Sequence, residues 1–310
     1  MRAYVVPAFG APGAVAERPI PEAGEGEILV RVKAAGVNAM DPIIVAGYAR
    51  EYMEHRLPLV PGIEYAGVVE AVGPGVEELA PGDEVFGAVA KPYLGGGSWA
   101  EYVTANAALA RRRPDALDAP TAATLAVAGG TALALVEAVG VEAGQTVLVV
   151  GAAGGVGSIV VQLAARAGAT VIAATSAQHA DEVRSLGASE VIDYAGDLLA
   201  QVKSGHPEGV DSVIDNFHDA AGLLALAAAV KPGGRVASPV AQGLEEAFAD
   251  QPVSAALVRA ASDRAGELAD LVVSGELRVP ITTHTLADGS RALEAQATRQ
   301  APGKLVIVID

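Results

Sequence analysis

The fold is decided by one stretch, Val147–Gly157, which reads VLVVGAAGGVG. An apolar run typical of a buried strand comes first, and an apolar helical pattern over residues 156–167 begins inside the glycine-rich part. Ala152, Gly154 and Gly157 occupy the three positions of the spacing that dinucleotide-binding folds use, although the first is not glycine. Glycines let the backbone approach a pyrophosphate, and the first amides of the helix can donate to its oxygens.

A tight turn between strand and helix, with no ligand, is the alternative interpretation of this loop. The strand before it and the helix after it favour dinucleotide binding. We therefore predict that the ligand is contacted by Gly151, Ala153, Gly154, Gly155, Val156 and Gly157.

Strands alternate with helical segments on both sides of this loop. The predicted strands are residues 146–150, 170–175, 190–193, 210–215 and 233–239, with helices between them at 156–167, 180–186 and 220–230. Repeated βαβ units of this length imply a parallel sheet with right-handed crossovers. Beyond it the pattern predicts a long helix over 255–274, a strand near 277–281 and a terminal strand over 304–309.

The first part of the chain has a different character. Residues 27–34 and 65–72 alternate apolar and polar, Pro-Gly and Gly-Asp pairs mark turns between such segments, and no helical period is sustained before about Asp118. We predict an α/β protein with a mostly antiparallel β domain at 1–117 and 281–310. A doubly wound Rossmann domain is predicted at 118–280.

Composition excludes several classes of function. The 310 residues contain 37 acidic and 21 basic side chains, a net charge of −16, which disfavours nucleic-acid binding. The absence of cysteine excludes disulfides, thiolate zinc sites and iron–sulfur clusters. The start, MRAYVVP, lacks a signal-peptide core and predicts a cytoplasmic protein. Two apolar stretches, 119–136 and 143–166, contain glycines and polar residues that indicate soluble burial, so we expect no membrane partner.

The strand over 170–175 bears on the choice of cofactor. NAD-specific folds usually end this strand with an acidic residue that holds the ribose 2′-hydroxyl. Here it ends in Thr175 and Ser176, whose hydroxyls can donate to a 2′-phosphate. His179 can add positive charge, although it also fits an ordinary surface position and two acidic residues follow it. NADPH is therefore predicted over NADH.

The ends of the later strands supply further candidates. Ligands of doubly wound sheets bind at the carboxyl ends of the strands. Asn216 and Phe217 follow the strand over 210–215, and Pro239 follows the next one. We predict that all three contact the cofactor.

With the β domain first and this loop in the middle, the whole chain resembles the medium-chain dehydrogenase/reductase superfamily. The matching segments, in order, are AAGVNAMD at 34–41, PGIEYAGVV at 61–69, PGDEVFG at 81–87, GSWAEYV at 97–103, GTA at 130–132, GASEVIDY at 187–194 and KPGGR at 231–235. The resemblance implies a GroES-like catalytic domain, a Rossmann domain and hydride transfer with a nicotinamide cofactor. It also implies a homodimer formed through sheet edges of the Rossmann domains.

The family divides on zinc. Zinc-dependent members hold the catalytic metal with a Cys, a His and a second Cys, and the matching positions here are Asn38, Ile63 and Val127. Glu64 persists, but one carboxylate does not make a zinc site. The chain thus resembles the zinc-independent quinone oxidoreductase-like branch, with no metal. Without a Lewis acid, a quinone or an α,β-unsaturated carbonyl is easier to reduce than an isolated ketone.

The resemblance also implies candidates for the chemical step. Tyr48 matches a region where related reductases place a functional tyrosine, and its phenol can donate to a developing enolate. A tyrosine packed at the rim of the cleft, with no chemical role, is an equally good interpretation. Asn38 is implied near the nicotinamide, and Asp41 is implied to orient it or the neighbouring backbone.

Three further cofactor contacts follow from the resemblance alone. Thr131 matches a hydroxyl that approaches the nicotinamide side, Tyr194 a residue near the adenine-side phosphate, and Lys304 a lysine of the closing strand. The leading hypothesis is therefore an NADPH-dependent, zinc-independent oxidoreductase acting on a small quinone or enone. An enoyl-thioester reductase, which would need a long pocket with a basic rim, and a low-turnover NADPH-binding sensor protein remain as alternatives.

Overall fold

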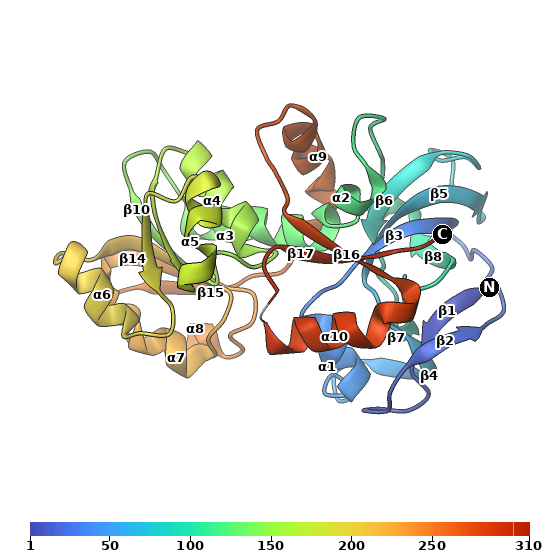
Figure 1. Ribbon diagram of the computed structural model, residues 1–310, viewed down its shortest axis with the longest axis horizontal. Coiled ribbons are helices and arrows are strands. Elements are labelled where there is room, and N and C mark those ends of the chain that lie inside the picture. Colours follow the sequence, from blue (N-terminus) through green and yellow to red (C-terminus); the bar gives the residue numbers. More distant parts are fainter. Residues whose placement is uncertain (300) are drawn as a thin grey trace. The chain divides into compact units, whose positions relative to one another are not determined.

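The computed structural model describes residues 1–299 and 301–310, which divide into two compact units (Figure 1). The first unit comprises Met1–Gly130 and Ser262–Asp310, and the second comprises Thr131–Ala261. Residues 118–130 and 262–280, predicted as parts of the Rossmann domain, therefore lie in the first unit. The reason is packing: α2 (Ala119–Ala122) contacts β3 (Glu27–Gly36), and α9 (Ala265–Val273) contacts η2 (Leu125–Gly129).

The second unit is built on six parallel strands in the order β12-β11-β10-β13-β14-β15. These strands are β10 (Thr146–Val150), β11 (Thr170–Thr175), β12 (Glu190–Asp193), β13 (Val210–Asp215), β14 (Val230–Ser238) and β15 (Ser254–Leu257). The chain starts in the middle of the sheet, builds outward to β12 and returns to β13 on the other side of β10. This order confirms the predicted doubly wound sheet, with a switch point between β10 and β13.

Helices cover both faces of this sheet. Figure 1 shows α4 and α5 on one side and α6 and α7 on the other. The helices of the unit are α3 (Gly130–Val139), α4 (Gly157–Arg166), α5 (Ala180–Ser185), α6 (Leu198–Gly205), α7 (Ala220–Ala225) and α8 (Leu244–Ala247), with short turns η3 (Ala177–His179) and η4 (Ala227–Ala229). Ile159, Val160 and Val161 of α4 are fully buried, so the apolar run after the glycine loop faces protein.

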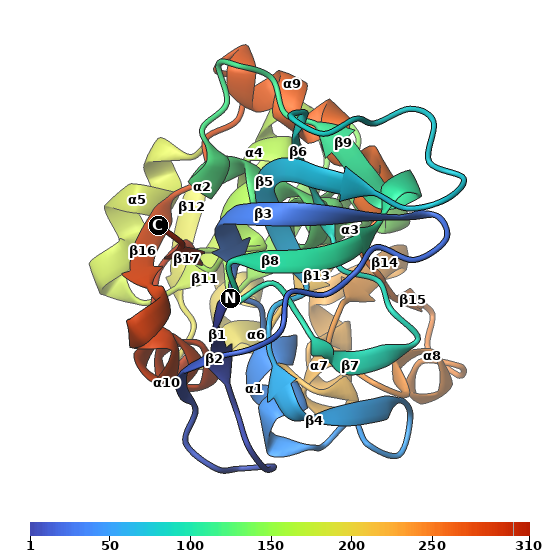
Figure 2. The same cartoon turned by 90° about the vertical axis from the view of Figure 1, so that its right-hand side faces the viewer.

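The first unit is organised around the ten-residue strand β3, which pairs antiparallel with β5, β8 and β17 (Figure 2). The other strands of this sheet are β5 (Glu64–Val72), β6 (Glu84–Ala88), β8 (Tyr102–Asn106), β9 (Ala110–Arg112), β16 (Ile281–Thr285) and β17 (Lys304–Val308). Two small sheets pair β1 (Arg2–Val5) with β2 (Ala14–Glu17), and β4 (Glu54–Val60) with β7 (Tyr93–Gly96). Short turns lie at η1 (Ala107–Leu109), η5 (Ser262–Arg264) and η6 (Leu286–Asp288), and α10 (Gly289–Thr298) precedes β17.

Several predicted elements are wrong. Helix α1 (Met40–Ala46) lies in a part expected to have none, and the strand expected at 277–281 starts only at Ile281. The long helix predicted over 255–274 is strand β15 followed, after a turn, by the shorter α9. Ser254–Leu257 pairs in register with β14, so sheet pairing outweighs the helical propensity of this alanine-rich segment.

Among the described residues, Ala119–Val139 is the one helical stretch long and apolar enough to cross a membrane. Two thirds (67%) of its most apolar window is buried inside the protein, as in a core helix.

Candidate functional site

The parallel sheet gathers many of the predicted cofactor contacts at one edge. Parallel strands end on the same side of a sheet, and Val150, at the end of β10, lies in register with Ala174 and Asp215 of its two neighbours. The residues that follow the strand ends at this edge are Gly151, Ser176, Tyr194, Asn216 and Pro239.

The glycine loop between β10 and α4 has little room for side chains. Gly151 has a positive φ of 74°, which favours glycine. A Cβ on Gly157 would lie 2.1 Å from the carbonyl oxygen of Gly151, so only glycine fits there. A Cβ on Gly154 would meet only that same oxygen, at 3.3 Å. The amides of Ser158 and Ile159 already donate to the carbonyls of Gly154 and Val156, so the loop fits the phosphates of a dinucleotide through the amides that precede them and the positive end of the α4 dipole.

The end of β13 adds a polar arrangement that sequence reasoning missed. The buried carboxylate of Asp215 accepts hydrogen bonds from the backbone N–H groups of Phe217 (2.7 Å) and His218 (2.8 Å) and contacts Nδ1 of His218 at 2.7 Å. Asn216 Nδ2 donates to the carbonyl of Val150 at 3.2 Å. Its Oδ1 is buried and has no partner in the described chain, so it can accept from a bound ligand. The sequence feature that could have predicted this arrangement is Asp215, an acidic residue at the end of a predicted buried strand.

Tyr194 and Phe217 meet above this edge. Their ring centroids lie 6.0 Å apart in an edge-to-face contact, and both side chains are partly exposed. Tyr194 follows β12 and Phe217 follows β13, with β11 and β10 between them in the sheet. The pair therefore crosses the carboxyl ends of the two strands that flank the predicted nucleotide site.

The side chains predicted to recognise a 2′-phosphate are less favourable than expected. Thr175 is buried, whereas Ser176 is half-exposed, so only Ser176 can reach a bound phosphate. Nδ1 of His179 lies 3.6 Å from a carboxylate oxygen of Glu182, which offsets any positive charge there. Thr131 is buried at the start of the second unit.

The first unit contains a buried ionic network that the sequence did not reveal. Nζ of Lys304 lies 2.8 Å from Oε1 of Glu64 and donates to Oδ1 of Asn38 at 2.6 Å and to the carbonyl of Val37 at 2.5 Å. Asn38 Nδ2 also donates to Oε1 of Glu64, at 2.9 Å, while Oε2 accepts from the amide of Val127 at 2.9 Å. Lys304 and Glu64 are 3% and 0% exposed.

This network changes the role predicted for Lys304. The lysine was implied as a cofactor contact, but its ammonium is enclosed by groups of the first unit, because β17 places it beside β3 and β5. Lys304 and Glu64 act as positioning residues for Asn38, whose amide can present one remaining N–H donor.

Asp41 is completely buried at the start of α1. Its two carboxylate oxygens accept from the backbone N–H groups of Asn38 (2.7 Å) and Gly62 (2.9 Å). Asp41 thus holds the backbone on both sides of the network. Burial raises the pKa of Asp41 to about 6, although these N–H groups lower it.

The raised pKa of Asp41 predicts that its contribution to stability depends on pH. Below about pH 4 the carboxyl is protonated in both the folded and the unfolded chain, and its contribution is fully present. As the pH rises from about 4 to 6, the carboxyl ionises in the unfolded chain while the buried group keeps its proton. The free energy of unfolding therefore falls by roughly 3 kcal/mol over this range and levels off above pH 6. We expect this fall in the difference between wild type and Asp41→Asn, measured by urea unfolding from pH 4 to 7.5. The exposed Asp250→Asn is the control, and a flat difference for Asp41 would contradict the prediction.

The three positions that match the zinc ligands of relatives carry unsuitable donors. Ile63 is apolar, Val127 offers a backbone N–H to Glu64, and Asn38 is engaged on both side-chain atoms. The Lys304 ammonium already supplies a positive charge to the remaining carboxylate, so these residues do not fit zinc. In the part of the chain that the structure describes, no group of three or more His, Cys, Asp or Glu residues is placed to hold a metal ion.

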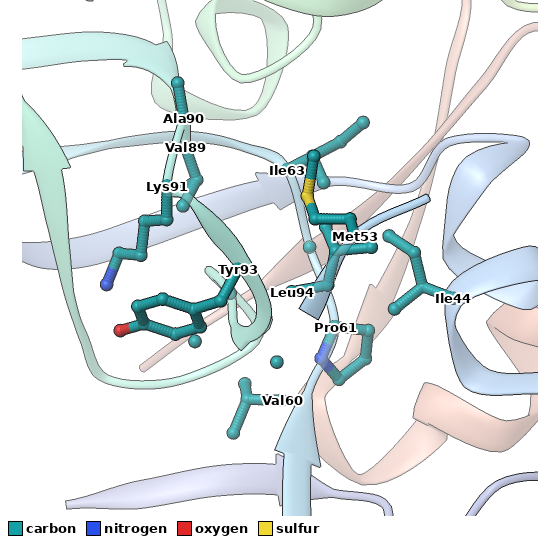
Figure 3. Close-up of a pocket in the computed structure, with 14 residues that line it drawn as sticks. Ile44, Met53, Val60, Pro61, Ile63, Val89, Ala90, Lys91, Tyr93 and Leu94 are labelled. Carbon is teal, nitrogen blue, oxygen red and sulfur yellow. The ribbon is translucent and has the colours of Figure 1, made fainter. Parts of the chain in front are cut away.

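Near this network, the first unit has an apolar pocket of about 240 Å³ (Figure 3). Its lining includes Ile44 of α1, Ile63 beside Glu64, and Lys91 and Tyr93, which the sequence did not single out. Tyr48 follows α1 and is 77% exposed, and it is not among the lining residues.

Comparison with known proteins covers both units. A family model described as "Alcohol dehydrogenase GroES-like domain" matches residues 24–115, and one described as "Zinc-binding dehydrogenase" matches residues 155–252. The chain is 31% identical over 204 residues (64% of this chain, 61% of the relative) to the chloroplastic quinone-oxidoreductase QR1 of Triphysaria versicolor. It is 34% identical over 224 residues (70% and 56%) to an Arabidopsis thaliana chloroplastic NADPH-dependent alkenal/one oxidoreductase.

Among solved structures, a mycobacterial protein in complex with NADPH is 31% identical, with a TM-score of 0.87 over 99% of this chain and 100% of that one. The sequence matches span 55–61% of the length of the first curated relatives.

Proposed function

The chain belongs to the medium-chain dehydrogenase/reductase superfamily, in its quinone-oxidoreductase-like branch, and we propose that it is an NADPH-dependent, zinc-independent oxidoreductase. Its substrate is a small quinone or α,β-unsaturated carbonyl compound. That it acts in the cytoplasm and as a homodimer belongs to the same proposal.

The observation that carries this proposal is the donor chemistry around Asn38. Asn38 is one of the positions that the resemblance matches to zinc ligands, and here an ammonium and a carboxylate hold its side chain, so its surroundings supply no Lewis acid for an isolated carbonyl. The names of the relatives support the same substrates: one is a quinone oxidoreductase and another acts on alkenals and enones.

The glycine loop and the end of β13 support cofactor binding. The loop from Gly151 to Gly157, at the amino end of α4, would hold the pyrophosphate, and Asn216 Oδ1 supplies a buried acceptor. Ser176 would donate to the 2′-phosphate, and the NADPH-bound mycobacterial relative supports this choice of cofactor.

The reaction would reduce a conjugated double bond without a metal. When bound, NADPH would supply a hydride to the conjugated carbon, and solvent would supply the proton that completes the reduction. The negative charge then spreads to the carbonyl oxygen, where a hydrogen-bond donor such as the remaining N–H of Asn38 or the phenol of Tyr48 can meet it. Lys304 and Glu64 hold the Asn38 amide in one orientation, so this donor needs no reorganisation.

A titration and a turnover assay test the proposal. We expect fluorescence titration to give a lower Kd for NADPH than for NADH, and absorbance at 340 nm to fall when a simple quinone or enone is added. In Tyr48→Phe, turnover should fall about 10- to 100-fold while the Kd for NADPH is unchanged, because only the donor hydroxyl is removed. Unchanged turnover in Tyr48→Phe would show that the Tyr48 phenol is not the donor. Failure of the protein to bind either nucleotide would overturn the proposal.

A further inference from the structure

Among the residues that the structure describes, the second unit exposes two large hydrophobic side chains, and these two touch each other. They are Tyr194, which is 43% exposed, and Phe217, which is 38% exposed, and their ring centroids lie 6.0 Å apart. A single exposed apolar side chain is ordinary on a protein surface. An exposed aromatic pair at the ligand-binding edge of a parallel sheet instead indicates a binding surface.

The pair lies over the half of the sheet that serves the adenosine end of a dinucleotide. In doubly wound folds, the strand before the glycine loop and its next neighbour in sequence lead to the pyrophosphate and to the adenosine ribose, and these strands are β10 and β11 here. Tyr194 follows β12 and Phe217 follows β13, three strand spacings away, or about 14 Å. Because the ring centroids are only 6.0 Å apart, the two side chains and the loop ends that carry them converge over the ends of β10 and β11.

Phe217 is held in this place by the buried carboxylate of Asp215. That carboxylate accepts from the backbone N–H groups of Phe217 and His218 and contacts Nδ1 of His218. The rings of Phe217 and His218 meet edge to face, with centroids 5.1 Å apart and an interplanar angle of 86°. Gly222 of α7 packs closely on the imidazole, since a Cβ there would lie 3.1 Å from Cβ and 3.2 Å from Cδ2 of His218. The Phe217 ring is therefore positioned before a ligand binds, which lowers the entropic cost of binding.

The chemistry of this surface favours a flat, uncharged ring as its ligand. Tyr194 and Phe217 offer aromatic area, and Nδ1 of His218 lies 2.7 Å from a carboxylate oxygen that balances any positive charge on the imidazole. A nicotinamide dinucleotide carries two rings. Adenine belongs to the half of the fold built on β10, β11 and β12, which the aromatic pair crosses, whereas nicotinamide belongs to the half that begins at β13.

We propose that Tyr194 and Phe217 form a platform on which the adenine of the cofactor stacks, and that Asp215 and His218 are positioning residues for Phe217. The inference rests on the cofactor of the proposed function. It assigns much of the affinity for the adenosine end to the ring at position 217.

Calorimetric titration of two cofactor fragments tests the platform. Adenosine 2′,5′-bisphosphate carries the adenine half of NADPH, and reduced nicotinamide mononucleotide lacks it. In Phe217→Ala we expect the Kd for NADPH and for the bisphosphate to rise about 10-fold, because one stack of a base on a ring is lost. The Kd for the mononucleotide should not change. Phe217→Tyr keeps the ring and should keep all three values, as should Ile20→Ala, which removes an exposed apolar side chain of the first unit.

Tyr194→Leu removes the other ring of the pair and should separate the two fragments in the same way, so the test does not depend on the folding of one variant. Thermal midpoints check that each variant is folded. A Kd for the bisphosphate within twofold of wild type in both variants would overturn the proposal. A loss confined to the mononucleotide would also overturn it, because the rings would then serve the nicotinamide.

Two substitutions of His218 test the positioning role. In His218→Leu we expect the Kd for the bisphosphate to rise about fivefold, because Asp215 loses a hydrogen-bond partner and the loop before Phe217 loosens. In His218→Asn the amide Nδ2 can take the place of Nδ1 beside Asp215, so most of the affinity should return. An equal loss for both fragments, or no recovery in His218→Asn, would show that His218 supports the unit as a whole and does not position Phe217.

Saturation-transfer NMR separates the platform from the reaction. We expect the C–H protons of the adenine ring to receive the strongest signal when the bisphosphate binds wild type, and to lose it in Phe217→Ala. If the protein binds NADPH in this way but reduces neither quinone nor enone, the proposed reaction fails and the platform stands. If it reduces them while Phe217→Ala binds the bisphosphate as wild type does, the function stands and the platform is disproved. Failure of wild type to bind NADPH, NADH or the bisphosphate would overturn both.

Discussion

Replacing Lys304 by methionine lowers the free energy of unfolding of the first unit by about 3–5 kcal/mol, the range expected when one partner of a buried ion pair is removed. Glu64 is completely buried, and the variant leaves its carboxylate with two neutral N–H donors and no positive charge. The measurement is urea unfolding followed by the fluorescence of Trp99, the single tryptophan, which is buried in this unit.

Two further variants show whether the loss comes from the pair. In the double variant Lys304→Met with Glu64→Gln, a large part of the stability should return, because no uncompensated charge remains. Arg31→Met removes the arginine of an exposed pair with Glu70 in the same unit and should cost at most about 1 kcal/mol. A loss in Lys304→Met no greater than in this control would show that the buried pair contributes nothing.

Replacing Gly154 by valine raises the Kd for NADPH about 100-fold, a loss of roughly 2.7 kcal/mol in binding. The space at Gly154 is open except for the Gly151 oxygen, so the valine methyls would occupy the surface that the cofactor phosphates need. Turnover at a fixed NADPH concentration should fall with it. Fluorescence titration measures the Kd, and circular dichroism checks that the fold is kept.

Gly205→Val is the matched control. Gly205 lies at the end of α6 in the same unit, and a Cβ there would meet nothing nearer than 3.8 Å. It precedes the amino end of β13, away from the carboxyl edge of the sheet. The control should keep the wild-type Kd, and a Kd in Gly154→Val within threefold of wild type would show that the loop does not hold the cofactor.

The elements of the nucleotide-binding unit could be predicted from the sequence because the patterns that specify them are local. The run from Val147 to Gly157 places strand, turn and helix within eleven residues, and the turn's close contacts, such as Gly157 against Gly151, arise within it. The same periodicity then predicted β11, β12, β13 and β14, because buried parallel strands are short continuous apolar runs. Recognition of the superfamily rested on ordered segments of this kind, and the comparisons confirm it.

Elements that depend on distant partners were misread. Residues 254–257 look helical alone, yet they form β15 because β14 offers an unpaired edge. Residues 118–130 and 262–280 joined the first unit for a similar reason: the packing of α9 on η2 links segments more than a hundred residues apart.

The chemistry of the first unit depended wholly on such contacts. Asn38 lies 26 residues from Glu64 and 266 residues from Lys304 along the chain. No local sequence pattern around any of the three predicts that the other two are its partners. Pairing of β17 and β5 with β3 brings them to one buried point. Periodicity and turn chemistry act over a few residues and so specify the nucleotide-binding elements. The energy of a buried charge depends on every group around it, so these partners emerge only when the chain has folded.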